Sequence, residues 1–383
     1  MTEGINNSTI NEDLPHSVDT TGVWLARITG FCSILGSLVV INLILGNHSQ
    51  RREKLSRVPN RLVLAIGIVD IPSSIAIALS TLAVPPVDDQ EKWSHDDELM
   101  GNTASCSAQG FFVQIGMAIP LYTAMLCIFY LCFLCYGLTE KEFIKRYEPL
   151  IHLLCFVYPL SSAFIGAFSD SFNDIGVAMC WFAPYPWNCQ IDTEIECTRG
   201  KHTDLYRFIF SVLPIFASFL TVTISMILIV RFVNKWAKSN NQNNSRPTPQ
   251  QKETATQAML YISIFILTYI FHIIHIILHA IEGEEKNKND HVFPEVVYLH
   301  FTLFPLQGFW NAVVYTRPII LQLRQHNPGK SLAWATKILL FHPNSITLYI
   351  NSSSFNTSRA STENIIIDTN EESYISSLSA PTI

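Results

Sequence analysis

Residues 62–84 read LVLAIGIVDIPSSIAIALSTLAV, a run in which Asp70 is the single charged side chain. A helix of about 20 residues crosses the hydrocarbon core of a bilayer, so a run of this length and composition predicts a membrane-spanning helix. The composition of the whole chain agrees with this class, because 49% of its 383 residues are hydrophobic and 15% are charged. Soluble domains carry roughly 25% charged residues.

Further apolar runs bring the predicted number of spans to seven. The backbone of each run is expected to be α-helical, because lipid offers no hydrogen-bond partner to a free N–H or C=O group. The predicted fold is therefore an all-α integral membrane protein, a seven-transmembrane helix bundle. The other six runs are Gly22–Leu45, Ala108–Cys135, Leu150–Phe168, Phe208–Val233, Ala258–Ile281 and Val296–Tyr315.

Charged residues are distributed unevenly among the segments that join these spans. With the N-terminus outside, 18 of the 25 Lys and Arg residues lie on the cytoplasmic side and 21 of the 31 acidic residues lie outside. Cytoplasmic loops of membrane proteins carry the excess of Lys and Arg. We therefore expect a multi-pass protein of the plasma membrane, with an extracellular N-terminus and a cytoplasmic C-terminus.

The chain is expected to have four parts: an extracellular tail at 1–21, a transmembrane domain at 22–317, an amphipathic membrane-surface segment at 318–341, and a disordered Ser/Thr-rich cytoplasmic tail at 342–383. The amphipathic segment is expected to open with a new helix at Pro318, since proline suits a first helical turn. Asn6 and Asn7 begin overlapping glycosylation sequons. Phosphorylation of the last part would create an anionic arm for an arrestin-like partner, although disorder alone also explains its composition.

Cysteines outside the predicted spans all fall on the expected outer side, where an oxidising environment favours disulfides. Four cysteines allow three pairings. The favoured pairing joins the first to the second, which ties the start of the third span to the second outer loop, and the third to the fourth, which closes a small loop. These cysteines are Cys106, Cys180, Cys189 and Cys197.

Asp70 is the candidate switch residue, because it lies nine residues past Arg61 and so about 13 Å into its span. A carboxylate at that depth costs several kcal/mol unless it is partnered or protonated. Asn311 and Tyr315 on the seventh span are expected near the same site. The site is interpreted as a switch or sodium site, and the alternative is a protonated Asp70 that hydrogen-bonds for packing only.

Three histidines share one face of the sixth span near its outer end. His272, His275 and His279 have a spacing that suits a metal ion or a proton sensor. His300 and Glu282 would complete such a site. The same face also suits a polar stripe packed against neighbouring helices, and we expect this packing role, with no bound metal.

Catalytic signatures are absent from the sequence. There is no His-Glu-x-x-His, no glycine-rich phosphate loop and no Gly-x-Ser-x-Gly. No Lys lies in the seventh span or deep in another span, which excludes a retinal Schiff base. We therefore expect no enzyme activity, no cofactor and no nucleic-acid partner.

Several motifs resemble one receptor group. Residues 106–114 read CSAQGFFVQ, residues 180–181 read CW, residues 307–315 read QGFWNAVVY, and residues 68–70 read IVD. Together they resemble the cyclic-AMP receptor-like group of G-protein-coupled receptors, and secretin-like receptors share the Cys-Trp pair. The resemblance implies a receptor that rearranges its helices on ligand binding and activates a heterotrimeric G protein. It also supports the Cys106–Cys180 disulfide.

The expected binding surfaces follow from this topology. An unknown small-molecule or peptide ligand is expected to contact Gln114, Trp181, His275, His279 and Gln307 at the outer mouth of the bundle. The G protein is expected to contact basic residues of the inner loops: Arg51, Arg52, Lys54, Lys145, Arg146, Lys235 and Lys238. The same charges could instead set the topology and bind anionic lipid. Alternative functions are a transporter or channel, or a proton- or metal-sensing receptor that uses the histidines of the sixth span.

Overall fold

The computed structural model describes residues 20–46, 48–86, 99–175, 179–186, 189, 195–239, 249–282 and 294–346. Contacts within the chain divide it into two compact units, Met1–Val314 and Tyr315–Ile383. The described residues of both units are mostly helical.

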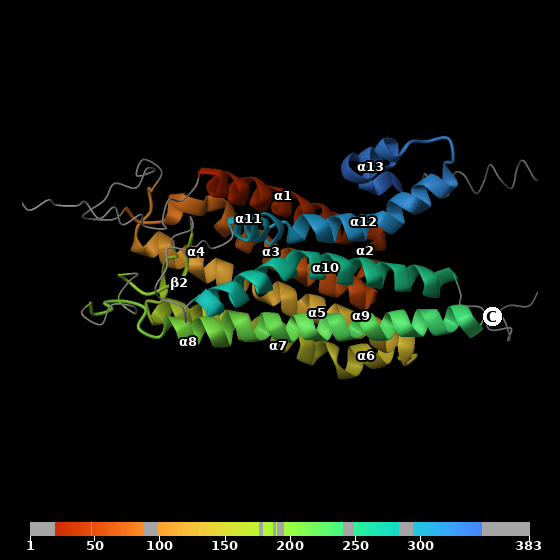
Figure 1. Cartoon of the computed structure of the whole chain (residues 1–383). Helices are drawn as coiled ribbons and strands as arrows, with labels where there is room; N and C mark the ends of the chain where they lie inside the picture. The colour runs from red at the N-terminus through yellow and green to blue at the C-terminus, as the bar shows by residue number, and fades with distance from the viewer. Residues whose placement is uncertain are drawn as a thin grey trace, which may run out of the picture. The chain divides into compact units, whose positions relative to one another are not determined.

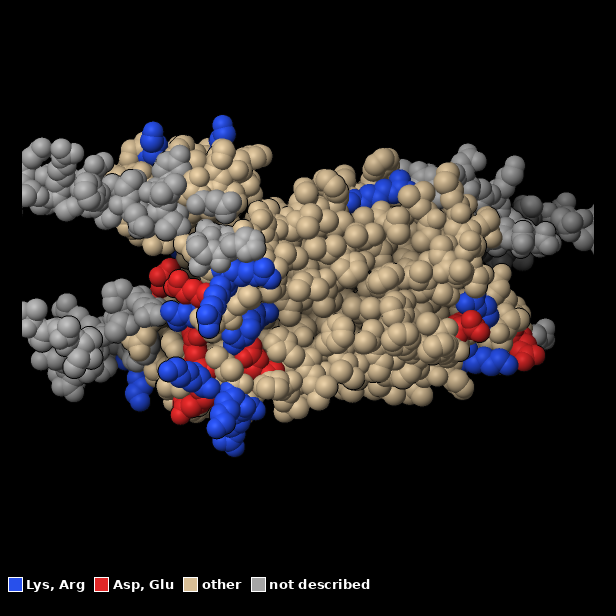
Figure 2. All heavy atoms as spheres, turned by 180° about the vertical axis from the view of Figure 1, so that it is seen from behind, with Lys and Arg blue, Asp and Glu red and all other residues tan. Residues whose placement is uncertain are grey.

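The first unit carries the membrane helices. Within the described residues, six helices are long and apolar enough to cross a membrane: Thr21–Leu45, Val58–Ala83, Thr103–Cys135, Glu148–Phe168, Thr203–Lys235 and Gln251–Ile274. They agree with the first six predicted spans to within a few residues at most of their ends. On the face shown in Figure 2, the charged side chains gather towards two ends and leave a broad band without charge between them. This arrangement indicates a multi-pass membrane protein.

The elements of the first unit run in an up-and-down order (Figure 1). The long helices are α1 (Thr20–Leu45), α3 (Val58–Leu79), α4 (Thr103–Ile115), α5 (Ala118–Cys135), α7 (Glu148–Phe168), α9 (Leu213–Ser239) and α10 (Pro249–Glu282). The short helices are α2 (His48–Ser56), α6 (Glu140–Arg146) and α8 (Thr203–Arg207). A 3-10 turn, η1 (Ser80–Ala83), follows α3, and a π-helical turn, η3 (Phe208–Val212), leads into α9.

The seventh predicted span is broken in the structure. It consists of α11 (Pro294–Leu303) and α12 (Gln307–His326), which are separated at Phe304–Leu306. Pro305 lies in this gap, and its missing N–H cannot continue the ladder of helical hydrogen bonds. The expectation of one continuous helix here is therefore wrong.

Helix α12 also runs through Pro318 without a break, so the predicted start of a new helix at this proline is wrong. A proline inside a helix leaves the carbonyl four residues earlier without its usual donor. That carbonyl belongs to Val314, and the Gln257 side chain of α10 donates a hydrogen bond to it at 2.7 Å. The substitute donor replaces the missing hydrogen bond, which is one part of what a proline costs inside a helix.

A short β-hairpin caps one end of the first unit. Strands β1 (Phe172–Asp174) and β2 (Cys180–Phe182) pair antiparallel, with Phe172 opposite Phe182. The structure pairs Cys106 with Cys180 and Cys189 with Cys197, the pairing that the sequence favoured. We call this end of the unit, marked by the hairpin and the disulfides, the hairpin end. The opposite end, marked by Arg51, Arg52, Lys145 and Arg146, is the basic end.

The second unit contains the end of α12, helix α13 (Leu332–Phe341) and a short 3-10 turn, η4 (Pro343–Ser345). Leu323, Ala335 and Ile338 form its buried cluster, with Ile319 and Ile320 packed against it. The apolar face predicted to lie on a membrane surface is therefore used at least in part to pack α12 against α13. The Ser331 side chain caps α13 by accepting a hydrogen bond from the Trp334 N–H at 3.2 Å.

Candidate functional site

Asp70 lies at a junction of α1, α3 and α12, and only 2% of it is exposed. Three serine hydroxyls donate hydrogen bonds to its carboxylate. Ser37 donates to Oδ2 at 2.7 Å, Ser33 donates to Oδ2 at 3.0 Å, and Ser74 donates to Oδ1 at 3.2 Å. Ser33 and Ser37 are one helical turn apart on α1, so both hydroxyls face the same carboxylate.

The N-terminus of α12 meets the same carboxylate through Ser33. Gly308 is the second residue of α12, so its N–H is one of the four that lack an acceptor inside the helix. It donates to Ser33 Oγ at 2.8 Å, and Ser33 donates onward to Asp70. The positive end of the α12 dipole therefore favours negative charge at Asp70.

Two glycines allow this close approach. A Cβ on Gly308 would overlap Asp70 Oδ2 and the hydroxyls of Ser33 and Ser37. A Cβ on Gly36 of α1 would lie 2.6 Å from the Gly308 carbonyl oxygen. The close packing at the junction thus requires glycine at both positions.

The chemistry available at this junction follows from its charge. Among the described residues, no Lys or Arg forms an ion pair with Asp70. A buried charge without a basic partner is costly, and hydroxyl donors and a helix terminus offset only part of that cost. Such a carboxylate can take up a proton or a small cation, and either would change how tightly α1 and α12 are held. The described residues contain no group of three or more His, Cys, Asp or Glu that could hold a metal ion.

The structure does not bring the predicted partner Asn311 into hydrogen-bonding contact with Asp70. Asn311 is buried, and its Nδ2 has no hydrogen-bond partner among the described residues. Tyr315 begins the second unit. The partners that the sequence analysis missed are the serines of α1 and α3. Their signal was the i, i+4 spacing of Ser33 and Ser37 within an otherwise apolar run.

At the hairpin end, a hydrogen bond between Gln114 and Trp181 connects α4 to the hairpin. Gln114 has no exposed surface. Its Nε2 donates to Ser162 Oγ at 2.8 Å and to the Phe210 carbonyl at 3.1 Å, while its Oε1 accepts from Trp181 Nε1 at 3.0 Å. In this arrangement all polar atoms of the predicted pocket residue Gln114 are therefore engaged by the protein itself. The Phe210 carbonyl lies in the π-helical turn η3, next to the Ile209 carbonyl, which accepts from Tyr158 Oη at 2.6 Å.

The hairpin fills the space beside α4 and α7. Gln109, which the sequence analysis did not assign, donates to the carbonyls of Ala76 and Ser80 at 2.9 Å and accepts from Cys180 N–H at 2.7 Å. A Cβ on Gly110 or on Gly166 would overlap the Phe172 ring. Hydrogen bonds, a disulfide and aromatic packing thus hold the hairpin tightly against α4 and α7.

Gln307, the other predicted pocket residue, joins α12 to α10. Tyr269 Oη donates to Gln307 Oε1 at 2.7 Å, and both side chains are buried. One turn further along α10, His272 Nδ1 lies 3.3 Å from His300 Nε2 of α11. The side chains of His275, His279, Glu282 and Lys238, and the sequons at Asn6 and Asn7, lie outside the described residues.

At the basic end, Lys54 has an internal role. Its Nζ donates to the Leu43 carbonyl at 2.7 Å, so it caps the C-terminus of α1. Desolvation by burial lowers the pKa of Lys54 below its ordinary value. Asn60 Nδ2 donates to the Lys54 carbonyl at 2.8 Å. Lys54, one of the predicted G-protein contacts, therefore also has a structural role within the chain.

An ion pair that the sequence analysis missed joins α3 to α7 at this end. Arg61 Nη2 lies 2.7 Å from Glu148 Oε2, and Arg61 Nε donates to Glu148 Oε1. Arg61 Nη1 also donates to the Leu55 carbonyl of α2. His152 lies one turn along α7, with its Nε2 3.6 Å from Glu148 Oε1. The ion pair fixes α2 and the starts of α3 and α7 relative to one another.

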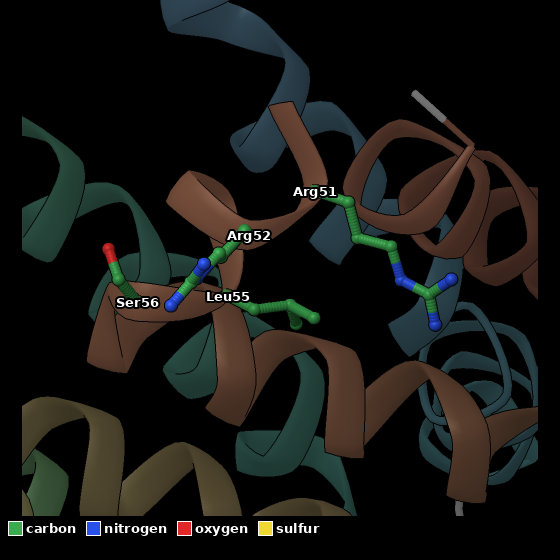
Figure 3. Close-up of a pocket in the computed structure, with 4 residues that line it drawn as sticks. All are labelled: Arg51, Arg52, Leu55 and Ser56. Carbon is green, nitrogen blue, oxygen red and sulfur yellow. The ribbon is translucent and has the colours of Figure 1, made fainter. Parts of the chain in front are cut away.

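Two shallow hollows open at the basic end. The first, of about 450 Å³, is lined by Arg51, Arg52, Leu55 and Ser56 of α2. Figure 3 shows Arg51 and Arg52 pointing away from each other, with Leu55 between them. The second hollow, of about 420 Å³, is lined by Leu138, Glu142, Lys145, Arg146 and Tyr147. Four of the predicted G-protein contacts therefore line hollows, and Lys235 on α9 is exposed.

No protein-family model matches the chain, and no curated protein is similar enough to match it.

Proposed function

We propose that the chain is a G-protein-coupled receptor of the plasma membrane, with seven membrane helices and an extracellular N-terminus. The observation that carries the proposal is the Asp70 junction. There, a membrane-buried carboxylate connects α1 and α3 to the N-terminus of α12, the helix that is also bonded to α10 through Gln307 and Gln257. A change at this junction would alter three helices together.

The geometry of α11 and α12 supports a seventh crossing. Residues 294–314 would span about 30 Å at 1.5 Å per helical residue, which matches the hydrocarbon core. Helices with a break can cross a membrane when the freed backbone groups find partners. Here Phe304 N–H donates to the His300 carbonyl at 2.9 Å, Trp310 N–H donates to the Leu306 carbonyl at 3.0 Å, and Gly308 N–H donates to Ser33.

The two ends of the first unit suit the two sides of a receptor. Disulfides at the hairpin end fit an extracellular, oxidising environment. The basic end fits the cytoplasmic side by the distribution of Lys and Arg. Its hollows at Arg51, Arg52, Lys145 and Arg146 offer positive charge and an apolar floor to a G protein. The tail at 342–383 remains the proposed site of phosphorylation and of an arrestin-like partner.

The hydrogen bond between Gln114 and Trp181 shifts the proposed ligand site. Because the hairpin packs against α4 and α7, the proposed small-molecule or peptide ligand instead lies beside α10, α11 and the start of α12, near His272 and His300. To contact Gln307 it would have to displace the Tyr269–Gln307 hydrogen bond. A ligand shifts an equilibrium only as far as it binds one arrangement better than the other. Binding against Gln307 would favour one position of α12 and so one state of the Asp70 junction.

Complex formation tests this proposal. The purified full chain, in lipid nanodiscs, would be mixed with nucleotide-free heterotrimeric G proteins that represent the main α-subunit classes. We expect one class to bind, and we expect Arg146→Glu or Arg52→Glu to weaken binding by about tenfold through charge repulsion. Lys201→Glu, at an exposed site on the hairpin end, is the matched control. Binding that responds equally to all three substitutions would contradict the assigned surface.

The break between α11 and α12 beside Asp70 favours a second candidate, an ion-coupled transporter, because discontinuous helices often carry ion sites in transporters. Ion flux into sealed vesicles separates the two functions. A transporter should give flux that Asp70→Asn abolishes, whereas a receptor should give none above protein-free vesicles.

The pair of His272 and His300 favours a narrower alternative, a receptor for protons or zinc. Its test is the response of G-protein binding to zinc and to pH in the parent chain and in the His300→Ala variant. An identical response in both would exclude these histidines as the sensor.

A further inference from the structure

In two places a glutamine from another helix donates a hydrogen bond to a backbone carbonyl near a proline. Gln114 donates to the Phe210 carbonyl at 3.1 Å, in the π-helical turn η3 that precedes Pro214. Pro318 frees the Val314 carbonyl, to which Gln257 donates at 2.7 Å. In lipid an unpaired carbonyl is costly, so the Gln257 donor offsets part of what Pro318 costs α12.

The two glutamines differ in whether the amide oxygen Oε1 accepts a hydrogen bond. Gln114 Oε1 accepts from Trp181, and Gln114 Nε2 also donates to Ser162, so every part of its amide is engaged. Gln257 Oε1 is buried and has no hydrogen-bond partner among the described residues. An unpaired buried acceptor offsets part of what the donor side contributes. The Gln114 amide is therefore fully hydrogen-bonded. The contact between Gln257 and Val314 depends on one hydrogen bond, and the unpaired Gln257 Oε1 offsets part of its stabilisation.

The position of Gln257 suits a separation of α10 from α12 at the Gln257–Val314 contact. Gln257 lies eight residues from the start of α10, at the end where α9 stops and α10 begins (Figure 1). The Tyr269–Gln307 bond holds the same two helices further along. If this contact opens, the Gln257 amide reaches water near the basic end and both of its polar atoms become paired, while Val314 loses its donor. The hydration of the Gln257 amide and the loss of the Val314 hydrogen bond therefore oppose each other when the two helices separate.

We propose that Gln257 is a positioning residue that latches α10 onto α12 through the carbonyl freed by Pro318, and that release of this latch is the step that opens the basic end. This inference rests on the proposed receptor function for its purpose, although the latch itself is a property of the isolated chain. An open contact would present the Val314 carbonyl and the Gln257 amide to a cytoplasmic partner, and the closed contact hides both.

The test measures the distance between α10 and α6 in the purified full chain without any G protein. Nitroxide labels would be attached through Lys141→Cys and Glu253→Cys, both at exposed positions, in a background with Cys132→Ser and Cys135→Ser. We expect Gln257→Ala to raise the ratio of long-distance to short-distance populations about fivefold, the effect of losing one hydrogen bond. Gln257→Met, which keeps the length of the side chain, should do the same and serves if the alanine variant folds poorly. Thr256→Ala, at the exposed neighbouring position, should leave the ratio unchanged.

A second arm tests the role of the proline. Pro318→Ala restores the N–H that can donate to the Val314 carbonyl inside α12. In that background Gln257→Ala should change the population ratio less than twofold, because the carbonyl keeps a donor. An unchanged ratio for Gln257→Ala in the parent background would overturn the latch. An equal change in both backgrounds would overturn the link to Pro318. A population shift without G-protein binding in any variant would support the latch and count against the receptor function.

Discussion

Gly308 and Asp70 lie so close together that a Cβ on the glycine would overlap the carboxylate oxygen Oδ2. The N-terminus of α12 can reach α1 and α3 only because this position has no side chain. The same glycine donates its N–H to Ser33 at 2.8 Å. One residue thus supplies both the space and the hydrogen bond that join α12 to the buried carboxylate.

Gly308→Ala should therefore destabilise the first unit. The added methyl group must displace Asp70 or the α12 backbone, and forced overpacking of this kind costs about 1–3 kcal/mol. The melting temperature of the purified chain in detergent should fall. Gly22→Ala is the matched control, because nothing lies within 4 Å of that position on α1. An equal melting temperature for Gly308→Ala and the parent chain would show that the junction is looser than described.

Ser37→Ala should weaken the junction from the α1 side. Ser37 makes the shortest of the serine hydrogen bonds to Asp70, at 2.7 Å. Removing a donor to a buried carboxylate costs about 1–3 kcal/mol. Ser161→Ala is the control, since that exposed hydroxyl donates only to the Tyr158 carbonyl of its own helix. If both variants unfold at the same denaturant concentration, Asp70 does not depend on Ser37.

The Arg61–Glu148 ion pair should matter more for stability than pairs on the surface. Its side chains are 24% and 9% exposed, so Glu148→Gln leaves a partly buried guanidinium without its counter-charge. Breaking buried pairs costs about 3–5 kcal/mol, and the partial exposure of Arg61 lowers the expected loss to about 2–3 kcal/mol. Glu196→Gln, in an exposed pair with Lys201, should cost under about 0.5 kcal/mol. Denaturant unfolding of both variants measures the difference, and similar losses would contradict the role of the Arg61 pair.

The two disulfides should contribute unequally. Cys106–Cys180 closes 74 residues of chain and Cys189–Cys197 closes 8. Chain entropy gives about 4.5 kcal/mol for the longer loop and about 2.5 kcal/mol for the shorter one. Replacing the first pair by serine should therefore lower surface expression more than replacing the second pair. Surface labelling of cells measures the expression of both variants. A larger loss on replacing Cys189 and Cys197 would contradict the larger contribution assigned to Cys106–Cys180.

Sequence alone predicts the first six spans well because each apolar helix satisfies its own backbone in lipid, so length and composition suffice. The seventh span shows the limit of that reasoning. Pro305 lies in the gap between α11 and α12, whereas α12 continues through Pro318. At Pro318 the missing donor is replaced by Gln257, which belongs to a helix distant in sequence, and composition cannot reveal such a contact.

The candidate site was predictable to a similar extent. Asp70 stands out because it is a charge within an apolar run. Depth counting placed Gln114 and Asn311 along their helices but could not show which atoms of other helices they meet. Gln114 forms hydrogen bonds with Ser162, Phe210 and Trp181. The serines that bind Asp70 escaped notice because single serines are common in membrane helices.

Nucleotide exchange is the measurement that bears most directly on the proposed receptor function. The purified chain in lipid nanodiscs would be added to each heterotrimeric G protein of the panel, first alone and then with a collection of small molecules and peptides that includes cyclic AMP. A receptor should accelerate exchange on at least one G protein, and Gly308→Ala or Arg146→Glu should reduce that acceleration by tenfold or more, on the order of one lost functional contact. Exchange that stays at the rate of empty nanodiscs throughout, together with ion flux that requires Asp70, would contradict the receptor and establish a transporter.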